Sequence, residues 1–232
     1  MLRPAGALPV LAAAALGLFG CGAGAPLLHP AHVLHAGDVS AGAGLSGELV
    51  VSSGADPSGR LLQLAAASGV APWVSGRVGL AGDNEAGLTY TGRNVRLDVR
   101  HAFAIGAAAL SVGIGGSLII AERPGVDVHG RDVGVFGGGI DVPVLFGVRS
   151  KSDLYAFWVG PRGGFEALGD GEGSVRHWLG GFVVGVRGGF RHVHVALELD
   201  GGYHRADGTA LGSSIGVGLF TLTPSGALVF SF

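Results

Sequence analysis

Histidines and carboxylates cluster in the last fifth of the chain, and their spacing is the one most suited to chemistry. Five of them share one parity: His192, His194, His204, Glu198 and Asp200. Residues two apart on a strand face the same side, so this spacing permits a shared metal ion, with His177 as a further ligand from a neighbouring strand. Polar side chains that only hydrogen-bond to one another give the same spacing. We favour that second interpretation and predict no metal and no other cofactor.

Nucleophilic catalysis has less support. It needs a hydroxyl or thiol close to a histidine that a carboxylate orients. The sequence has no His-x-Ser arrangement. Glycine clusters at residues 113–116 and 137–139 are not phosphate loops, because such loops join a strand to a helix and these clusters lie within strand-like runs. We therefore expect that the protein is not an enzyme.

Charged residues also alternate with apolar ones elsewhere in the chain. The charged residues opposite the apolar face are Asp38, Glu48, Arg77, Arg96, Asp98, Arg100, Asp141, Arg149, Arg187, Glu198 and Asp200. Five are basic and six are acidic, so the two signs nearly balance. Buried charges must pair, whereas an ion-selective pore needs one dominant sign. We interpret the set as a paired network in a filled interior.

The composition restricts the elements that can position these residues. The chain has 232 residues, of which 46 are Gly, and it is 48% hydrophobic but only 14% charged. High hydrophobicity excludes a disordered chain, and the glycines lack the period of three that collagen requires. So many glycines also disfavour a helical bundle. The net charge of −2 gives no reason to expect a nucleic-acid partner.

Apolar residues recur at every second position in runs of 9–18 residues, for example at 136–149, 176–190 and 191–200. Strands of soluble proteins usually have five or six residues, whereas a tilted membrane strand needs 9–11. In the second half of the chain, short polar connections alternate with long ones, as in outer-membrane barrels. The pattern predicts an all-β fold, an antiparallel up-and-down transmembrane β-barrel of eight to ten strands.

The C-terminal residues carry a family resemblance. The chain ends Gly-Ala-Leu-Val-Phe-Ser-Phe, with Phe230 and Phe232 on one face. This end resembles the last strand of bacterial outer-membrane β-barrel proteins, and the whole chain is similar to small Gly-rich barrels of Gram-negative bacteria. The resemblance implies a location in the bacterial outer membrane, contact with its lipid, and Phe230 and Phe232 as a signal for the barrel assembly machinery. It identifies no extracellular or periplasmic protein partner.

The N-terminus reads as an export signal. A basic Arg3 precedes an apolar run that is too short to span a bilayer but fits a signal peptide. The run ends Leu-Phe-Gly-Cys, which resembles the lipobox of bacterial lipoproteins, although Phe19 replaces the usual small residue. We assign residues 1–21 to the signal peptide with cleavage before or near Cys21, residues 22–34 to a linker and residues 35–232 to the barrel. Lipidation of Cys21 would anchor the protein; an ordinary signal peptide would discard it.

The number of strands stays open at this point. Apolar residues are odd-numbered up to Leu219 and even-numbered from Leu228, so the face has to switch near residues 221–226. A turn there gives ten strands when residues 38–48 are counted. A bulge at Pro224 gives eight strands that begin near Trp73, with residues 38–48 outside the set. Residues 60–68 are helix-forming, and we expect a short helix in this connection.

These observations favour a structural or interaction role through extracellular loops, without an open pore. Two alternatives remain. A lipid-anchored, lipocalin-like barrel would turn its apolar face inwards and bind a hydrophobic ligand. An envelope enzyme that modifies lipids would bring a nucleophile, a histidine and a carboxylate together at one rim.

Overall fold

The chain folds into ten long strands. A computed structural model describes residues 24–53, 69–123, 133–169, 173–210 and 213–232. The strands are β1 (Val39–Ser53), β2 (Gly69–Leu80), β3 (Asn84–Tyr90), β4 (Asn94–Ile105), β5 (Ala108–Arg123), β6 (Val133–Arg149), β7 (Tyr155–Gly169), β8 (Ser174–Phe190), β9 (Val193–Ala210) and β10 (Ser213–Ser231). In this part of the chain, no helix is long and apolar enough to span a membrane. The helix predicted for residues 60–68, the signal peptide and Cys21 lie outside the described residues.

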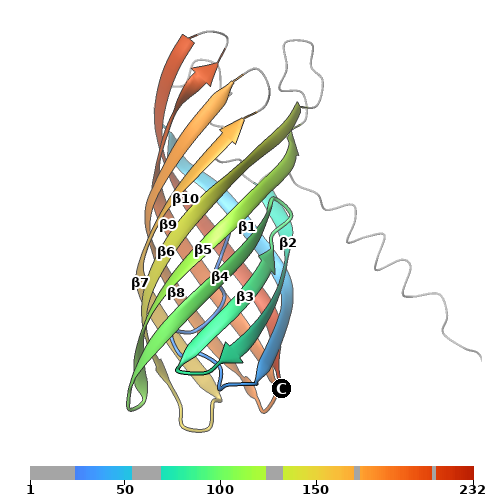
Figure 1. Cartoon of the computed structure of the whole chain (residues 1–232), viewed down its shortest axis with the longest axis vertical. Coiled ribbons are helices and arrows are strands. Elements are labelled where there is room, and N and C mark those ends of the chain that lie inside the picture. Colours follow the sequence, from blue (N-terminus) through green and yellow to red (C-terminus); the bar gives the residue numbers. More distant parts are fainter. Residues whose placement is uncertain (1–23, 54–68, 124–132, 170–172, 211–212) are drawn as a thin grey trace, which may run out of the picture.

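The strands close into a barrel. Each strand pairs antiparallel with its neighbours in the sequence, and β1 also pairs with β10 (Figure 1). Ala43 of β1, for instance, lies opposite Leu228 on one side and Val74 on the other. Closure satisfies the outer main-chain groups of every strand, so no edge is left for aggregation. The predicted all-β, up-and-down antiparallel barrel is confirmed.

Both ways of counting the strands from the sequence were wrong in detail, although the observed number, ten, lies within the predicted range of eight to ten. No turn breaks the chain at residues 221–226, because β10 is a single strand from Ser213 to Ser231. Residues 38–48 do not lie outside the set, because β1 completes the barrel. The tenth strand arises instead where residues 91–93 turn between β3 and β4. The polar residues 204–209 are not a connection but part of β9.

The apparent change of face in β10 is not a change of direction. Odd-numbered residues point inwards along the described part of the strand, including Val217, Leu219, Thr221 and Thr223. Val217 and Leu219 are apolar because they pack in an apolar cluster inside the barrel with Ile119 and other residues. Sequence parity misled here because apolar side chains occupy both faces of this strand.

The side chains alternate between the two sides of the barrel wall as the pattern predicted. Large apolar residues that face outwards include Val142, Phe146, Val186 and Leu197, each 43% to 55% exposed. Charged residues fill the other face, and Arg77 is one of many that are buried there. The barrel is thus apolar outside and polar inside, the reverse of a soluble protein.

The two ends of the barrel differ. We call the end that carries the C-terminus, at the bottom of Figure 1, the lower end. The connections at residues 81–83, 106–107, 150–154 and 191–192 lie there and are short. The left-handed φ of Gly82 (+72°) and Gly106 (+64°) allows two of these turns to be tight. Residues 91–93, between β3 and β4, turn towards the opposite, upper end.

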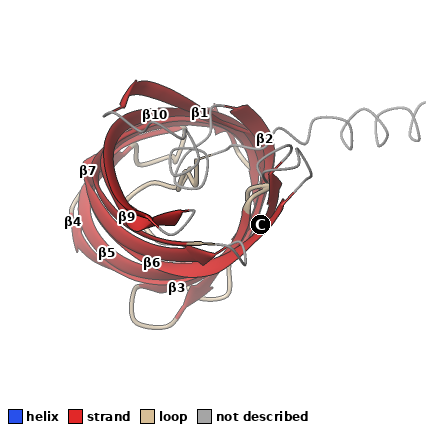
Figure 2. Cartoon of the chain, turned by 90° about the horizontal axis from the view of Figure 1, so that it is seen from above, coloured by secondary structure: helices blue, strands red, loops and turns tan. Residues whose placement is uncertain are grey.

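Residues 24–34 run through the inside of the barrel, and residues 35–38 connect them to β1 at the lower end; we call residues 24–38 the lumen segment. They have no strand or helix and precede β1, which starts at the lower end. Figure 2 shows loop backbone inside the ring of strands. Residues 24–34, predicted to be part of a linker, therefore fill the lumen.

Candidate functional site

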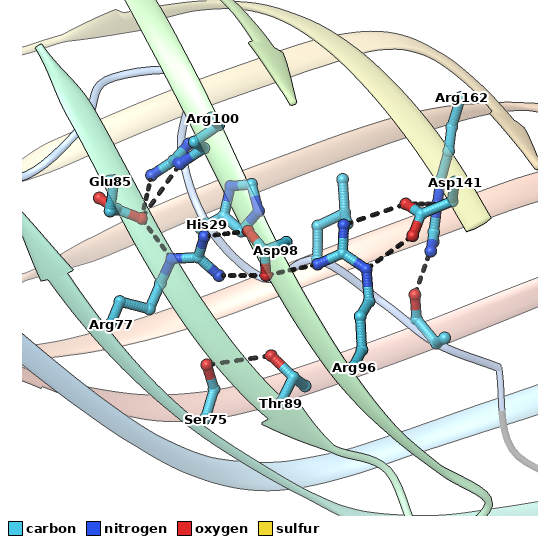
Figure 3. Close-up of polar contacts among 12 residues, drawn as sticks. His29, Ser75, Arg77, Glu85, Thr89, Arg96, Asp98, Arg100, Asp141 and Arg162 are labelled. Carbon is cyan, nitrogen blue, oxygen red and sulfur yellow. Dashed lines mark hydrogen bonds and ion pairs between the residues drawn. The ribbon is translucent and has the colours of Figure 1, made fainter. Parts of the chain in front are cut away.

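Buried arginines and carboxylates form a continuous chain across the lumen (Figure 3). Along this chain the residues follow in the order Arg100, Glu85, Arg77, Asp98, Arg96, Asp141, Arg162 and Asp200. They come from β2, β3, β4, β6, β7 and β9. Positive and negative groups alternate without a break, so the chain as a whole carries no net charge.

Asp98 occupies the middle of the chain. It accepts hydrogen bonds from Arg77 Nη2 at 2.5 Å and from Arg96 Nη1 at 2.6 Å. Arg77 Nε also donates to Glu85, and Arg100 Nη2 donates to the same Glu85 oxygen at 2.8 Å. All five side chains are at most 7% exposed. Charge-assisted bonds of this kind are the strong ones, and they hold three neighbouring strands together from inside.

Asp141, on β6, connects this group to residues of β7 and β9. It accepts from Arg96 Nε at 2.7 Å and from Arg162 Nε at 3.1 Å. Arg162 Nη1 then donates to Asp200 at 3.0 Å. Since isolated buried charges cost many kcal/mol, only such pairing makes a lumen with so many charges stable.

The structure places nine of the eleven predicted lumenal charges in the buried interior. They are Glu48, Arg77, Arg96, Asp98, Arg100, Asp141, Arg187, Glu198 and Asp200. Arg187 pairs with Asp153 at 2.7 Å near the lower end. Arg149 lines the lower mouth, and Asp38 lies there half-exposed, 3.4 Å from His35.

Four interior charges were missed: Glu85, Arg93, Arg162 and Glu166. Arg162 follows the buried Trp158 on the inner face of β7, so an apolar residue concealed the parity of this strand. Glu85 comes directly after a turn, where no alternation precedes it. Arg93 lies in the turn between β3 and β4, and its Nη2 is 3.2 Å from Glu166.

The wall holds the lumen segment by its main chain. Glu198 accepts from the N–H groups of Leu27 at 2.6 Å and Leu28 at 2.8 Å. Arg100 donates to the carbonyl oxygens of Pro30 and His32. Further contacts of the same type follow at both ends of the segment. This network couples the segment to the charged chain across the lumen.

An apolar ring surrounds the same segment at mid-height. Leu27, Leu28 and Ala31 are 0% to 3% exposed and pack with inward-facing apolar residues, among them Trp73 and Trp158. Trp73 and Trp158 are 2% and 0% exposed, so both lie inside the barrel and away from the membrane interface. Trp158 Nε1 donates to Glu198 at 2.9 Å, so its polar atom is satisfied there.

His29 is a buried polar side chain of the lumen segment. It is 3% exposed, and its Nε2 has no hydrogen-bond partner among the described residues. Its Nδ1 lies 3.4 Å from the carbonyl oxygen of Pro30.

A row of hydrogen bonds crosses the upper lumen. Thr221 Oγ1 lies 2.8 Å from His204 Nε2, and His204 Nδ1 lies 2.6 Å from His177 Nε2. His177 Nδ1 is 3.2 Å from Glu166. If Thr221 donates, each histidine can accept at Nε2 and donate at Nδ1, so one tautomer satisfies the whole row. The adjoining cavity of about 60 Å³ admits water but no lipid or peptide substrate.

The three histidines considered as metal ligands do not meet. His192 is exposed in the turn at the lower end, and His194 Nε2 contacts the carbonyl oxygen of Asp153 near the same end. His204 lies ten residues further along β9, about 33 Å at the rise of an extended strand. Among the described residues no group of three or more His, Cys, Asp or Glu is arranged to hold a metal ion.

Comparison with known proteins adds the fold alone. No protein-family model and no curated protein matches the chain. It is similar to neisserial surface protein A (11% identity, 84% of this chain and 96% of that chain, TM-score 0.40). It is also similar to the translocator domain of autotransporter NalP from Neisseria meningitidis (11%, 87% and 90%, 0.33) and to the outer membrane protease OmpT from Escherichia coli (9%, 84% and 97%, 0.30).

Proposed function

We propose that this protein is a small outer-membrane β-barrel with a filled lumen, which serves a structural or interaction role through the connections at its upper end. The outer surface supports the membrane location. Among the strand residues whose side chains the structure describes, the outward-facing Asp, Glu, Lys and Arg residues are Arg176, Arg205 and Asp207, all beside or above Trp178 towards the upper end. Below them the described outward-facing side chains form an apolar belt that is too large for a surface exposed to water.

The height of the belt fits a bilayer. On β8 the exposed aromatic residues Trp178 and Phe190, 57% and 65% exposed, are twelve residues apart. Twelve residues extend about 40 Å along a strand, and a tilt of 35–45° reduces this to about 30 Å. That is the thickness of the hydrocarbon core, with aromatic residues at both interfaces as membrane barrels have them.

The main support for a closed lumen is the alternating chain of buried ion pairs, together with the lumen segment that fills the space beside it. An open pore would line its interior with solvated side chains, whereas here the charges bond to one another and to the main chain of residues 24–38. The lipocalin-like alternative requires an apolar interior, and the large apolar surface faces outwards instead.

The C-terminal aromatic residues fit an assembly role. Phe230 and Phe232 are 39% and 71% exposed at the lower end, where the barrel assembly machinery could bind them. Lipidation of Cys21, outside the described residues, stays a prediction.

Fractionation and conductance together test this proposal. In cells we expect the protein in the sarkosyl-insoluble envelope fraction, with migration on gels that changes on heating. In planar bilayers the purified protein should give no conductance steps, while an open porin serves as positive control. Extraction as a soluble protein would refute the membrane location; steady channels in the intact protein would refute the closed lumen.

A further inference from the structure

The contacts of the lumen segment follow its sequence from the lower end upwards. The N–H of Leu34 donates to Glu85, close to the lower turn, at 2.9 Å. Contacts of Leu28 and Leu27 with Glu198 follow in mid-lumen. The carbonyl oxygen of Ala25 then accepts from Arg162 at 2.5 Å, and that of Gly24 from Ser46 Oγ at 2.9 Å. The segment is therefore threaded in one direction, with its N-terminal end uppermost.

Side chains of the barrel wall bind the main chain of the segment. Wall side chains form hydrogen bonds with seven main-chain groups of the segment: the N–H groups of Leu27, Leu28 and Leu34 and the carbonyl oxygens of Gly24, Ala25, Pro30 and His32. None of these bonds uses a side chain of the segment. Recognition of this kind depends on chain direction, because reversing a peptide exchanges donors and acceptors along it.

The wall is also shaped to admit the segment. A Cβ on Gly79 would lie 1.9 Å from the carbonyl oxygen of His35, so any side chain there would collide with the segment. Gly24, in the segment, likewise has no room for a side chain, because a Cβ on it would lie 2.2 Å from Thr223 Oγ1 of the wall. The apolar ring also encloses Leu27 and Leu28. Without the segment, the apolar wall side chains of this ring would be exposed to water.

We infer that the lumen is a directional binding site for an extended peptide, which it recognises by hydrogen bonds to the peptide main chain and by the apolar ring around Leu27 and Leu28. Its occupant is the lumen segment of the same chain, and once that segment is cut from β1 the site accepts a free peptide of the same sequence. This inference rests on the proposed closed lumen, but it adds that the closing element is a separable ligand.

The test keeps the full chain. A protease site is inserted between the exposed Ala36 and Gly37, and the folded protein is cleaved in detergent. Fluorescent peptides are then added, and uptake is followed by anisotropy and gel filtration. Uncleaved protein, which retains its own segment, is the control. We expect the cleaved protein to exchange its fragment for a peptide with the sequence of residues 24–36, and the uncleaved protein to take up none.

Three altered peptides test how the site recognises its ligand. N-methylation of Leu27 and Leu28, which removes the two donors to Glu198, should weaken binding about tenfold or more. The reversed sequence should weaken it at least as much. His29→Leu should not weaken it, because the imidazole Nε2 has no partner in the described lumen.

A matched pair of wall variants completes the test. Glu198→Gln should weaken uptake, whereas Glu166→Gln should not, because Glu166 is a partly buried carboxylate that bonds to Arg93 and His177. Equal binding of native and reversed peptides, or a cleaved protein that never takes up peptide, would overturn the inference. Conductance of the uncleaved protein, measured on the same preparation, reports separately on the closed lumen.

Discussion

Removing one carboxylate from the middle of the ion-pair chain should destabilise the whole barrel. Asp98 is 3% exposed and accepts from Arg77 at 2.5 Å and from Arg96 at 2.6 Å. Asp98→Asn keeps the shape but leaves the two guanidinium groups with only Glu85 and Asp141 as partners, and adds one uncompensated positive charge to the lumen. Breaking a buried ion pair costs about 3–5 kcal/mol, so we expect about 3 kcal/mol, since the amide retains one acceptor oxygen.

The assay is reversible urea unfolding in lipid vesicles, followed by the fluorescence of the buried Trp73 and Trp158. Asp207→Asn is the matched control, because Asp207 pairs with Arg205 at 3.2 Å on the outer surface, where the two side chains are 48% and 62% exposed. We expect the control to leave the midpoint unchanged. If Asp98→Asn shifts the midpoint no more than the control, the interior is hydrated and the argument from buried charge is wrong.

Further predictions concern the segment, the belt, the histidines and the N-terminus. Gly79→Ala should displace the lumen segment and increase its cleavage by added protease, whereas Gly76→Ala, with open space around its Cβ, should not. Leu97→Arg, at a belt position that is 61% exposed, should cost about 2–4 kcal/mol in vesicles if it lies near the bilayer midplane; no change would place it outside lipid. His204→Ala removes the partner of Thr221 Oγ1 and of His177 Nε2 and should cost about 1–3 kcal/mol in urea unfolding, but bound zinc should be absent before and after the change. Labelled palmitate should be incorporated into the protein and lost in Cys21→Ser; equal labelling of both would refute lipidation.

The outer surface could be predicted because its physical requirement is local. A lipid-facing position must be apolar whatever its neighbours are, so parity alone identified Val142, Val186 and Leu197. The converse does not hold, since Trp73 and Trp158 are apolar but face inwards. Apolar residues are allowed inside as well when an apolar partner is present, and that partner is a segment from a distant part of the sequence.

The interior network shows the same limit. The balance of signs indicated that lumenal charges pair, but no spacing indicated that Asp141 would lie between Arg96 and Arg162. Likewise His192 and His194 share parity with His204, yet they lie near the opposite end of β9. Parity gives the side of the wall but not the height or the neighbour across the lumen.

The sequence by itself determined the barrel class, the apolar outside and the near-neutral polar inside, because the alternation of side chains is a property of each extended strand. Only the tertiary structure decided the contents of the lumen. Which inward side chains meet depends on how ten strands are staggered when β1 pairs with β10, and on a segment without secondary structure that returns through their centre. Both depend on contacts between residues far apart in the chain, which the alternation of side chains along a single strand does not reveal.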